Sequence, residues 1–533
     1  MPLDKLRASL YNVLRASFSR SAGASSESST VEQNRAHTRR DSTTNHRGTS
    51  ESACASGCWR YSCLHVLKQF IGGIAVNPQD YLDANGNRIL DEVMEFARIP
   101  SVSTDPARAP DVLRAAEWVA DAVRKAGPFA VEVIPTPRHP IVYAEWLGAP
   151  GAPTILVYGH YDVQPPDPLE RWVSAPFEPN IREGRIYARG ISDDKAPMFM
   201  PIKAAEAFFA TVGRLPINVK FLFEGEEEIG SPDLEEFIRQ NKQRLAADFV
   251  MSADGAMWRI DEPSVSVSSR GLVGLEITVR GPAKDLHSGR HGGAIANPLH
   301  ALASLIAGLH TPEGRVAVAG FYDGVVELSP EEREAIAALP FDEGRYLSEV
   351  GAPSLFGEPG YNTLERQWVR PTLDVNGMWG GYQGPGGKTV IPSEAHAKIT
   401  CRLVPDQDPQ DVLAKVARHL EGHTPPGVKL DIRVSDHGTR AYRIPSDHVG
   451  LRVAEEVLEE VYGKKPLRVR IGGTLPVAEW FQRLLNQHVV FFSFSTADED
   501  FHAPNEFFRI HRLHEGLRAW ALYWERMGKV HLT

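Results

Sequence analysis

Cysteine is scarce in this chain, and its scarcity excludes one class of fold. Only four cysteines occur in 533 residues, and Cys54, Cys58 and Cys63 all lie in the atypical N-terminal segment. A disulfide framework of the kind that stabilises small secreted domains is therefore excluded. The three N-terminal cysteines have no standard zinc-site spacing and no fourth ligand nearby. Cys401 alone lies in the body of the chain, which favours a reducing, cytoplasmic location.

The chain also lacks an excess of positive charge and a long apolar run. Its formal net charge is -10 and its sequence pI is about 6.0, so it has no basic footprint for nucleic acid. The apolar run at residues 70–76 is far too short to span a bilayer. We therefore expect neither a nucleic-acid partner nor a membrane partner.

Large apolar side chains are almost absent from residues 21–52, which are rich in Ser, Thr, Arg and Glu. Such a segment cannot bury enough apolar surface to fold. The start of the chain is rich in Arg and Ser, which is also typical of organelle-targeting segments. We interpret residues 1–76 as a disordered or targeting-like tail, because the pattern becomes globular from Asn77 onward.

Strand and helix patterns alternate in the body of the chain. Residues 154–158 form a continuous apolar, β-branched run that ends at Gly159, which is typical of a buried strand. Alternating strands and helices predict a largely parallel sheet that is covered by helices on both faces. The other predicted elements of this part are helices at 111–126, 197–212 and 235–245 and strands at 131–135, 142–147, 219–223 and 249–251.

The pattern changes near Arg270 and returns after Arg470. Between these positions, residues 272–279 and 397–403 alternate like half-exposed strands, and Asn297-Pro298 and Asp408-Pro409 each begin a capped helix. A helix near 478–485 and an apolar strand at 489–494 then resume the first pattern. We expect an α/β protein with a mostly parallel sheet and an inserted smaller α/β domain. The expected boundaries are 77–270 and 471–533 for the two parts of the first domain and 271–470 for the insertion.

Acids and histidines follow five of the strand signals in the first domain. Each has an ordinary alternative interpretation as a turn, a helix cap, an exposed acidic run or a common histidine. However, strand ends of a parallel sheet meet at one edge, where many acids would repel one another without cations. The five segments together therefore predict a divalent metal site. These residues are His160, Asp162, Asp193, Asp194, Glu226, Glu227, Glu228, Asp254 and His502.

The same motifs resemble those of the dinuclear metallopeptidase family of carnosinases, glutamate carboxypeptidases and aminoacylases. The resemblance runs from about residue 77 to the end of the chain. The segment Val163-Gln164-Pro165 and the long insertion are more similar to the carnosinase-like dipeptidase branch. The motifs are Gly-His160-Tyr-Asp162-Val-Gln-Pro, Gly-x-x-Asp193-Asp194-Lys, Glu-Gly-x-Glu227-Glu228-x-Gly-Ser, Ser-x-Asp254 and Phe-His502-x-x-Asn-Glu.

The resemblance implies two divalent metal ions per subunit. His160, Asp193 and Asp254 would bind one ion, and Asp193, Glu228 and His502 would bind the other, so that Asp193 bridges the two. Zinc is the metal that the resemblance implies first, although mixed His and carboxylate ligands also suit Mn or Co.

The resemblance also assigns residues to the chemistry. Glu227 would be the general base for a metal-bridging water, and Asp162 would orient His160 through its second ring nitrogen. The peptide bond between Asp193 and Asp194 would be cis. Ala196 stands where relatives commonly have Gly, which leaves these groups intact.

The inserted domain would be a lid and dimerisation domain. The segment Asp285-Leu-His287-Ser-Gly resembles a motif whose histidine polarises the substrate carbonyl in the partner subunit of a homodimer. Arg402 would bind the terminal carboxylate of the substrate, although by its pattern alone it is a solvated strand residue. Lesser substrate contacts would come from Thr389, His437 and Thr474, the last standing where related dipeptidases often have Ser.

We therefore expect hydrolysis of dipeptides or short peptides that have a free C-terminal carboxylate. An N-acyl amino acid deacylase that uses the same mechanism is the alternative. A third hypothesis, a catalytically silent metal-binding assembly protein, is disfavoured because Glu227 is present. The expected partners are a small peptide substrate and a second copy of the chain.

Overall fold

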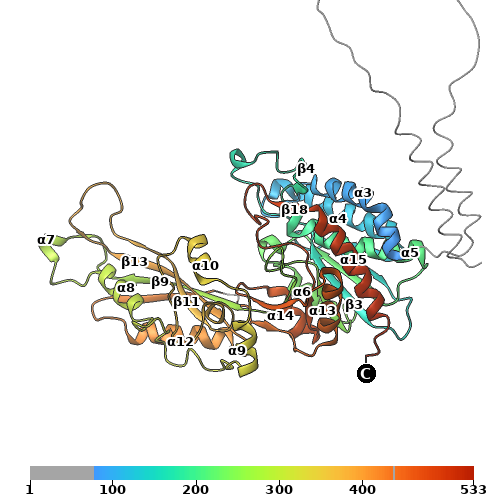
Figure 1. Cartoon of the computed structure of the whole chain (residues 1–533). Helices are drawn as coiled ribbons and strands as arrows, with labels where there is room; N and C mark the ends of the chain where they lie inside the picture. Colours follow the sequence, from blue (N-terminus) through green and yellow to red (C-terminus); the bar gives the residue numbers. More distant parts are fainter. Residues whose placement is uncertain (1–76, 436–437, 533) are drawn as a thin grey trace, which may run out of the picture. The chain divides into compact units, whose positions relative to one another are not determined.

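The computed structural model describes residues 77–435 and 438–532. The predicted tail at 1–76, with its three cysteines and its apolar run, lies outside the described residues, and so does His437. The described part is an α/β protein of mixed helices and strands (Figure 1). It contains two large apolar cores. No helix in this part is long and apolar enough to cross a membrane.

A six-stranded sheet with the order β1-β2-β6-β3-β7-β17 lies in the first core. The β3–β6, β3–β7 and β7–β17 pairs are parallel, whereas the β1–β2 and β2–β6 pairs are antiparallel. The apolar run that predicted a buried strand is part of β3, in which every residue after Thr154 is buried. The strands are β1 (Ala130–Ile134), β2 (Ile141–Trp146), β3 (Thr154–His160), β6 (Asn218–Glu224), β7 (Phe249–Ser252) and β17 (Val489–Phe491).

Helices pack around this sheet, because strands buried on both faces need apolar cover on both sides. Helix α5 contacts β3 and packs against α3, α4 and α15. The largest fully buried side chains of the core, Trp520 and Trp524, both lie on α15. The helices are α3 (Pro78–Ala97), α4 (Ala109–Ala126), α5 (Ala196–Thr211), α6 (Leu234–Gln240), α13 (Val449–Tyr462), α14 (Pro476–Leu485) and α15 (Ile510–Met527).

The inserted smaller domain has its own core and its own antiparallel sheet, in the order β11-β13-β9-β14. Buried and half-exposed residues alternate along β9 and β13, as the sequence predicts. The N-caps Asn297 and Asp408 accept backbone hydrogen bonds at the starts of α8 and α12, which pack on this sheet. The bounds are β9 (Gly271–Arg280), β11 (Thr372–Gly380), β13 (Glu394–Leu403), β14 (Lys429–Val434), α8 (Pro298–Ala307) and α12 (Pro409–Gly422).

Two strands flank the insertion and pair with each other in parallel: β8 (Ser264–Ser269) and β16 (Leu467–Ile471). The boundaries after residues 76, 270 and 470 stay predictions. The remaining elements are β4 (Asn180–Arg182), β5 (Arg185–Tyr187), β10 (Leu286–His287), β12 (Val390–Ile391), β15 (Tyr442–Arg443), β18 (Phe507–Arg509), α7 (Ser288–His291), α9 (Pro330–Ala337), α10 (Glu343–Val350) and α11 (Thr363–Trp368).

Two predicted elements are shorter in the structure. The helix expected at 235–245 ends at Gln240, because the backbone at Asn241 leaves the helical conformation, with φ −113° and ψ 28°. The strand expected at 489–494 ends at Phe491, although Phe492 and Phe494 remain buried. An apolar run indicates burial rather than strand pairing, and in this segment the buried residues continue beyond the end of β17.

Candidate metal centre

The carboxyl ends of three neighbouring parallel strands deliver acids and a histidine to one edge of the sheet. Strand β3 ends at His160, and Asp162 follows directly. Strand β6 is followed by a 3-10 turn that begins at Glu227. Asp254 lies two residues beyond the end of β7. Because the three strands are parallel and adjacent, these side chains converge, as open α/β sheets arrange their active sites.

His160, Asp193 and Asp254 form the first predicted ligand set. One ligand atom from each of them lies within 4.8 Å of the others. His160 is fully buried, and its Nε2 lies 3.0 Å from Asp193 Oδ1. This geometry is suited to a divalent cation with mixed nitrogen and oxygen ligands.

Asp193, Glu228 and His502 form the second predicted set, again within 4.8 Å of one another. His502 Nε2 lies 3.1 Å from Asp193 Oδ2 and 3.2 Å from Glu228 Oε2. Asp193 therefore presents one carboxylate oxygen to each of the two histidines, the arrangement that a bridging ligand requires. The Asp193-Asp194 peptide bond is cis, as the resemblance implied.

Asp162 contacts both His160 and the turn that carries two glutamates. The Nδ1 atom of His160 lies 3.1 Å from the backbone carbonyl oxygen of Asp162 and 3.4 Å from its Oδ1. The backbone N–H groups of Glu227 and Glu228 donate to its two carboxylate oxygens at 3.2 and 3.1 Å. Asp162 thus contacts a predicted ligand and holds the backbone of the turn that carries the predicted base.

Glu506 organises the same site, although no role is predicted for it in the sequence analysis. It is buried, and its carboxylate accepts hydrogen bonds from the loop that contains Asp193. The only signal in the sequence was its place in the quoted motif that begins at Phe501. Its donors are the backbone N–H groups of Gly190, Ser192 and Asp193, at 2.8, 3.0 and 3.2 Å, and the Arg189 guanidinium, at 2.7 Å.

The protein environment changes the proton affinities of the site. Burial raises the pKa of Glu227 well above its usual value, and the charges of Asp254 and Glu228 add to the effect. Burial also raises the pKa of Glu228, and it raises that of Asp254 to about 6. Hydrogen bonds to Asp193 and Glu228 raise the pKa of His502 to about 10. Crowded acids with raised pKa values fit a site that is completed by cations.

The predicted substrate residues form two separate groups. The Arg402 guanidinium donates to the Thr474 hydroxyl at 2.8 Å. His287 is exposed, and its Nδ1 accepts from the Gly289 N–H at 3.0 Å. The Thr389 carbonyl accepts from Ser288, beside His287. Among the hydrogen bonds of the described residues, none joins either group to the predicted metal ligands.

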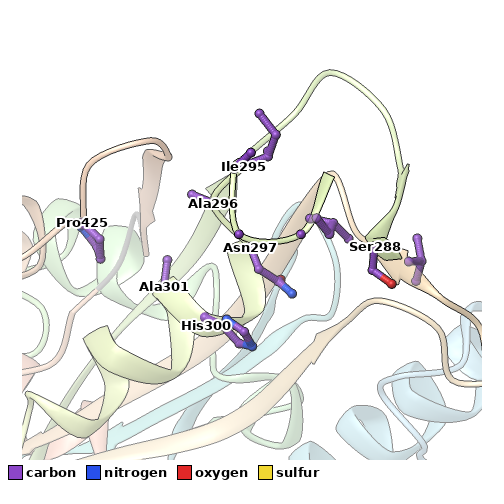
Figure 2. A pocket seen from close by; sticks show the side chains of 12 residues that line it. Ser288, Ile295, Ala296, Asn297, His300, Ala301 and Pro425 are labelled. Carbon is purple, nitrogen blue, oxygen red and sulfur yellow. The ribbon is translucent and has the colours of Figure 1, made fainter. Parts of the chain in front are cut away.

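A cavity of about 630 Å³ lies beside the segment that carries His287. Figure 2 shows Ser288 on one side of this cavity and Asn297, His300 and Ala301 of the α8 region on another. The lining includes none of the predicted metal ligands. This cavity is therefore a feature of the inserted domain and is distinct from the metal centre.

Comparison with known proteins identifies the class of enzyme. With two ligand sets that share one carboxylate at the end of an α/β sheet, the chain is a dinuclear metallopeptidase. The sequence model of peptidase family M20/M25/M40 matches residues 156–526 of this chain. The chain belongs to this family.

Relatives with curated names match most of their own length. The Cys-Gly metallodipeptidase dug1 of Schizosaccharomyces pombe is 30% identical over 466 residues, covering 85% of this chain and 98% of that protein. The human Beta-Ala-His dipeptidase is 29% identical over 468 residues, covering 85% and 92%. These relatives are metallodipeptidases or dipeptidases by name.

Solved structures match over a similar span. The structure of human carnosine dipeptidase 1 has a TM-score of 0.71 at 28% identity and covers 85% of this chain and 98% of that chain. An M20 family metallo-carboxypeptidase from Sulfolobus solfataricus has a TM-score of 0.72 at 32% identity, covering 83% and 99%.

We expect divalent metal binding to release protons and to tighten as the pH rises from about 6 to about 8. The reason is that the pKa of His502, raised to about 10, keeps a proton on this histidine in the metal-free protein, and the pKa of Asp254, raised to about 6, leaves it partly protonated at the lower end of this range. Calorimetric titration in two buffers of different ionisation enthalpy measures the proton release at each pH. Metal affinity that is independent of pH, with no proton release, would contradict this expectation.

Proposed function

We propose that this protein hydrolyses the peptide bond of dipeptides, or of short peptides with a free C-terminal carboxylate. The observation that carries the proposal is the position of Asp193, whose two oxygens face His160 and His502. The names of the relatives, Cys-Gly metallodipeptidase and Beta-Ala-His dipeptidase, support a dipeptide substrate.

The residues that would hold two cations are the two sets that share Asp193. His160 and Asp254 complete one set, and Glu228 and His502 complete the other. Bound divalent cations would polarise the scissile carbonyl and make water more acidic. The mixed His and carboxylate donors support zinc first, with Mn or Co as alternatives.

Glu227 is the proposed general base. It would take a proton from the attacking water and return it to the leaving amine, which requires a carboxylate of raised proton affinity. Burial among other acids raises the pKa of Glu227 in the metal-free protein. The hydrogen bond from the Glu227 backbone to Asp162 fixes the turn that carries this base.

The inserted domain would supply the substrate contacts. Arg402, held by Thr474, would bind the terminal carboxylate, for which a guanidinium is well shaped. His287 would act on the substrate carbonyl in a partner subunit, and Thr389 and His437 would contribute lesser contacts. The exposure of His287 supports a role outside its own subunit. The protein would therefore be a homodimer through this domain, and the single, buried Cys401 of the described residues supports a cytoplasmic location.

A panel of dipeptides, their C-terminal amides and N-acyl amino acids tests the proposed function. We expect kcat/KM to be highest for dipeptides with a free carboxylate. A strong preference for N-acyl amino acids would instead favour a deacylase. A metal-loaded protein that hydrolyses neither class would indicate a silent metal-binding protein.

The substitution Glu227→Gln tests the base. We expect it to retain two bound metal ions and to lower kcat by at least about a hundredfold, which is the usual contribution of a general base. Elemental analysis and steady-state kinetics measure the two quantities. Glu226→Gln is a matched control, since Glu226 accepts the His139 backbone N–H and lies outside both ligand sets. Full activity of metal-loaded Glu227→Gln would disprove the assignment.

Mixed dimers test the proposed action of His287 across subunits. Neither His287→Ala nor Glu227→Gln homodimers should be active, but a heterodimer has one site with both native residues. We expect that heterodimer to have about half of the activity of the wild-type dimer, because one of its two sites is native. Isolated heterodimers without activity would contradict the geometry across the interface, and active His287→Ala homodimers would contradict a catalytic role for His287.

A further inference from the structure

Arg270 links β8 to β9 and binds the loop that precedes Thr474. Its backbone N–H donates to the carbonyl of Gly473 at 2.9 Å. Its side-chain Nε donates to the carbonyl of Gly472 at 2.8 Å. One residue thus holds two successive carbonyl groups of this loop. The position of the Thr474 hydroxyl, which accepts from Arg402, depends on these bonds.

Arg270 also lies close to Arg402 at one end of the inserted sheet. Leu272 of β9 is the direct partner of Arg402 in β13. Arg270 precedes Leu272 by two residues, directly before β9 begins, so its backbone lies near the end of β13 that carries Arg402. Burial, and to a smaller extent the positive charge of Arg402, lower the pKa of Arg270 to about 10. The two guanidinium groups are therefore close enough to repel each other.

The hydrogen-bond acceptors of the two arginines are uncharged. Arg270 donates to backbone carbonyls of Gly472 and Arg370, and Arg402 donates to a hydroxyl. Asp374 is the acid whose charge acts on Arg270, but its carboxylate accepts from Thr372 and is exposed. Partly buried like charges are costly, and a bound anion offsets that cost. The two arginines thus concentrate positive charge beside the loop that precedes Thr474.

We propose that Arg270 is a positioning and specificity residue of the substrate site: it fixes Thr474 against Arg402 and makes the carboxylate-binding site doubly positive. This inference rests on the proposed dipeptidase function and deepens it. The substrate class that it selects is a peptide with an anionic C-terminal group. A bidentate carboxylate matches the planar donors of guanidinium groups.

The test compares Arg270→Gln with the wild-type enzyme on one dipeptide and on its C-terminal amide. We expect KM for the dipeptide to rise by about tenfold or more, with kcat within about twofold, because a binding contact has been removed. KM for the amide should change by less than about twofold. Arg270→Lys keeps the charge but loses the planar set of guanidinium donors. Its KM for the dipeptide should therefore lie between that of the wild-type enzyme and that of Arg270→Gln.

Arg280→Gln is the matched control. Arg280 ends β9, the strand that Arg270 precedes, is half exposed, and pairs with Glu394 and Asp431 at the surface. Its substitution should leave both KM values unchanged. If Arg270→Gln does not fold, as judged by its thermal transition, Arg270→Lys decides the test, and an unchanged KM in that variant contradicts the inference.

Two other outcomes would overturn the inference. One is an unchanged dipeptide KM in folded Arg270→Gln, and the other is an equal loss on the dipeptide and its amide, which indicates a purely structural role. The proposed function fails separately, when the wild-type enzyme itself hydrolyses none of the dipeptides. In that case, calorimetric binding of the dipeptide to metal-loaded Glu227→Gln, with and without Arg270→Gln, still tests the carboxylate site, and equal affinities contradict it.

Discussion

The rest of the structure depends on the crowding of carboxylates around Asp193. Parallel strands and two loops bring five potential ligands to one edge of the sheet, in two sets that share Asp193. Burial removes the water that would screen these charges, so Glu228 and Asp254 hold protons more tightly than free carboxylates do. Divalent cations turn that mutual repulsion into attraction. Bound cations would therefore offset the cost of holding several ionised carboxylates together at this edge of the sheet.

Two buried acids outside the ligand sets hold the site in place through backbone amides. Asp162 accepts from the turn that carries Glu227 and Glu228, and Glu506 accepts from the loop that carries Asp193. Such bonds fix loop geometry without adding a ligand, as outer partners do in metal sites generally. Arg270 has a comparable relation to the proposed carboxylate site, since it binds the loop before Thr474. Asp193, Glu227 and Glu228 and the loop before Thr474 thus each have a backbone that a second residue holds.

Local sequence patterns predicted those features whose structure is determined by residues close to one another in the sequence. The apolar run of β3, the acids after it, and the alternation along β9 and β13 are all readable because burial follows sequence periodicity. The role of Glu506 was not readable, because its amide partners lie more than 310 residues away. The contact between Arg402 and Thr474 joins residues 72 apart and depends on the same long-range folding. The proposed role of His287 depends on a second chain, so it follows only from the family resemblance of its motif and not from the periodicity of the sequence.

Anomalous diffraction from crystals of the metal-loaded protein tests the bridging position of Asp193 most directly. The account predicts two metal peaks per subunit about 3.5 to 4 Å apart, with one oxygen of Asp193 bound to each. His160 and Asp254 should complete the coordination of one ion, and Glu228 and His502 that of the other. A single fully occupied peak, or two ions with Asp193 bound to only one of them, would contradict the account.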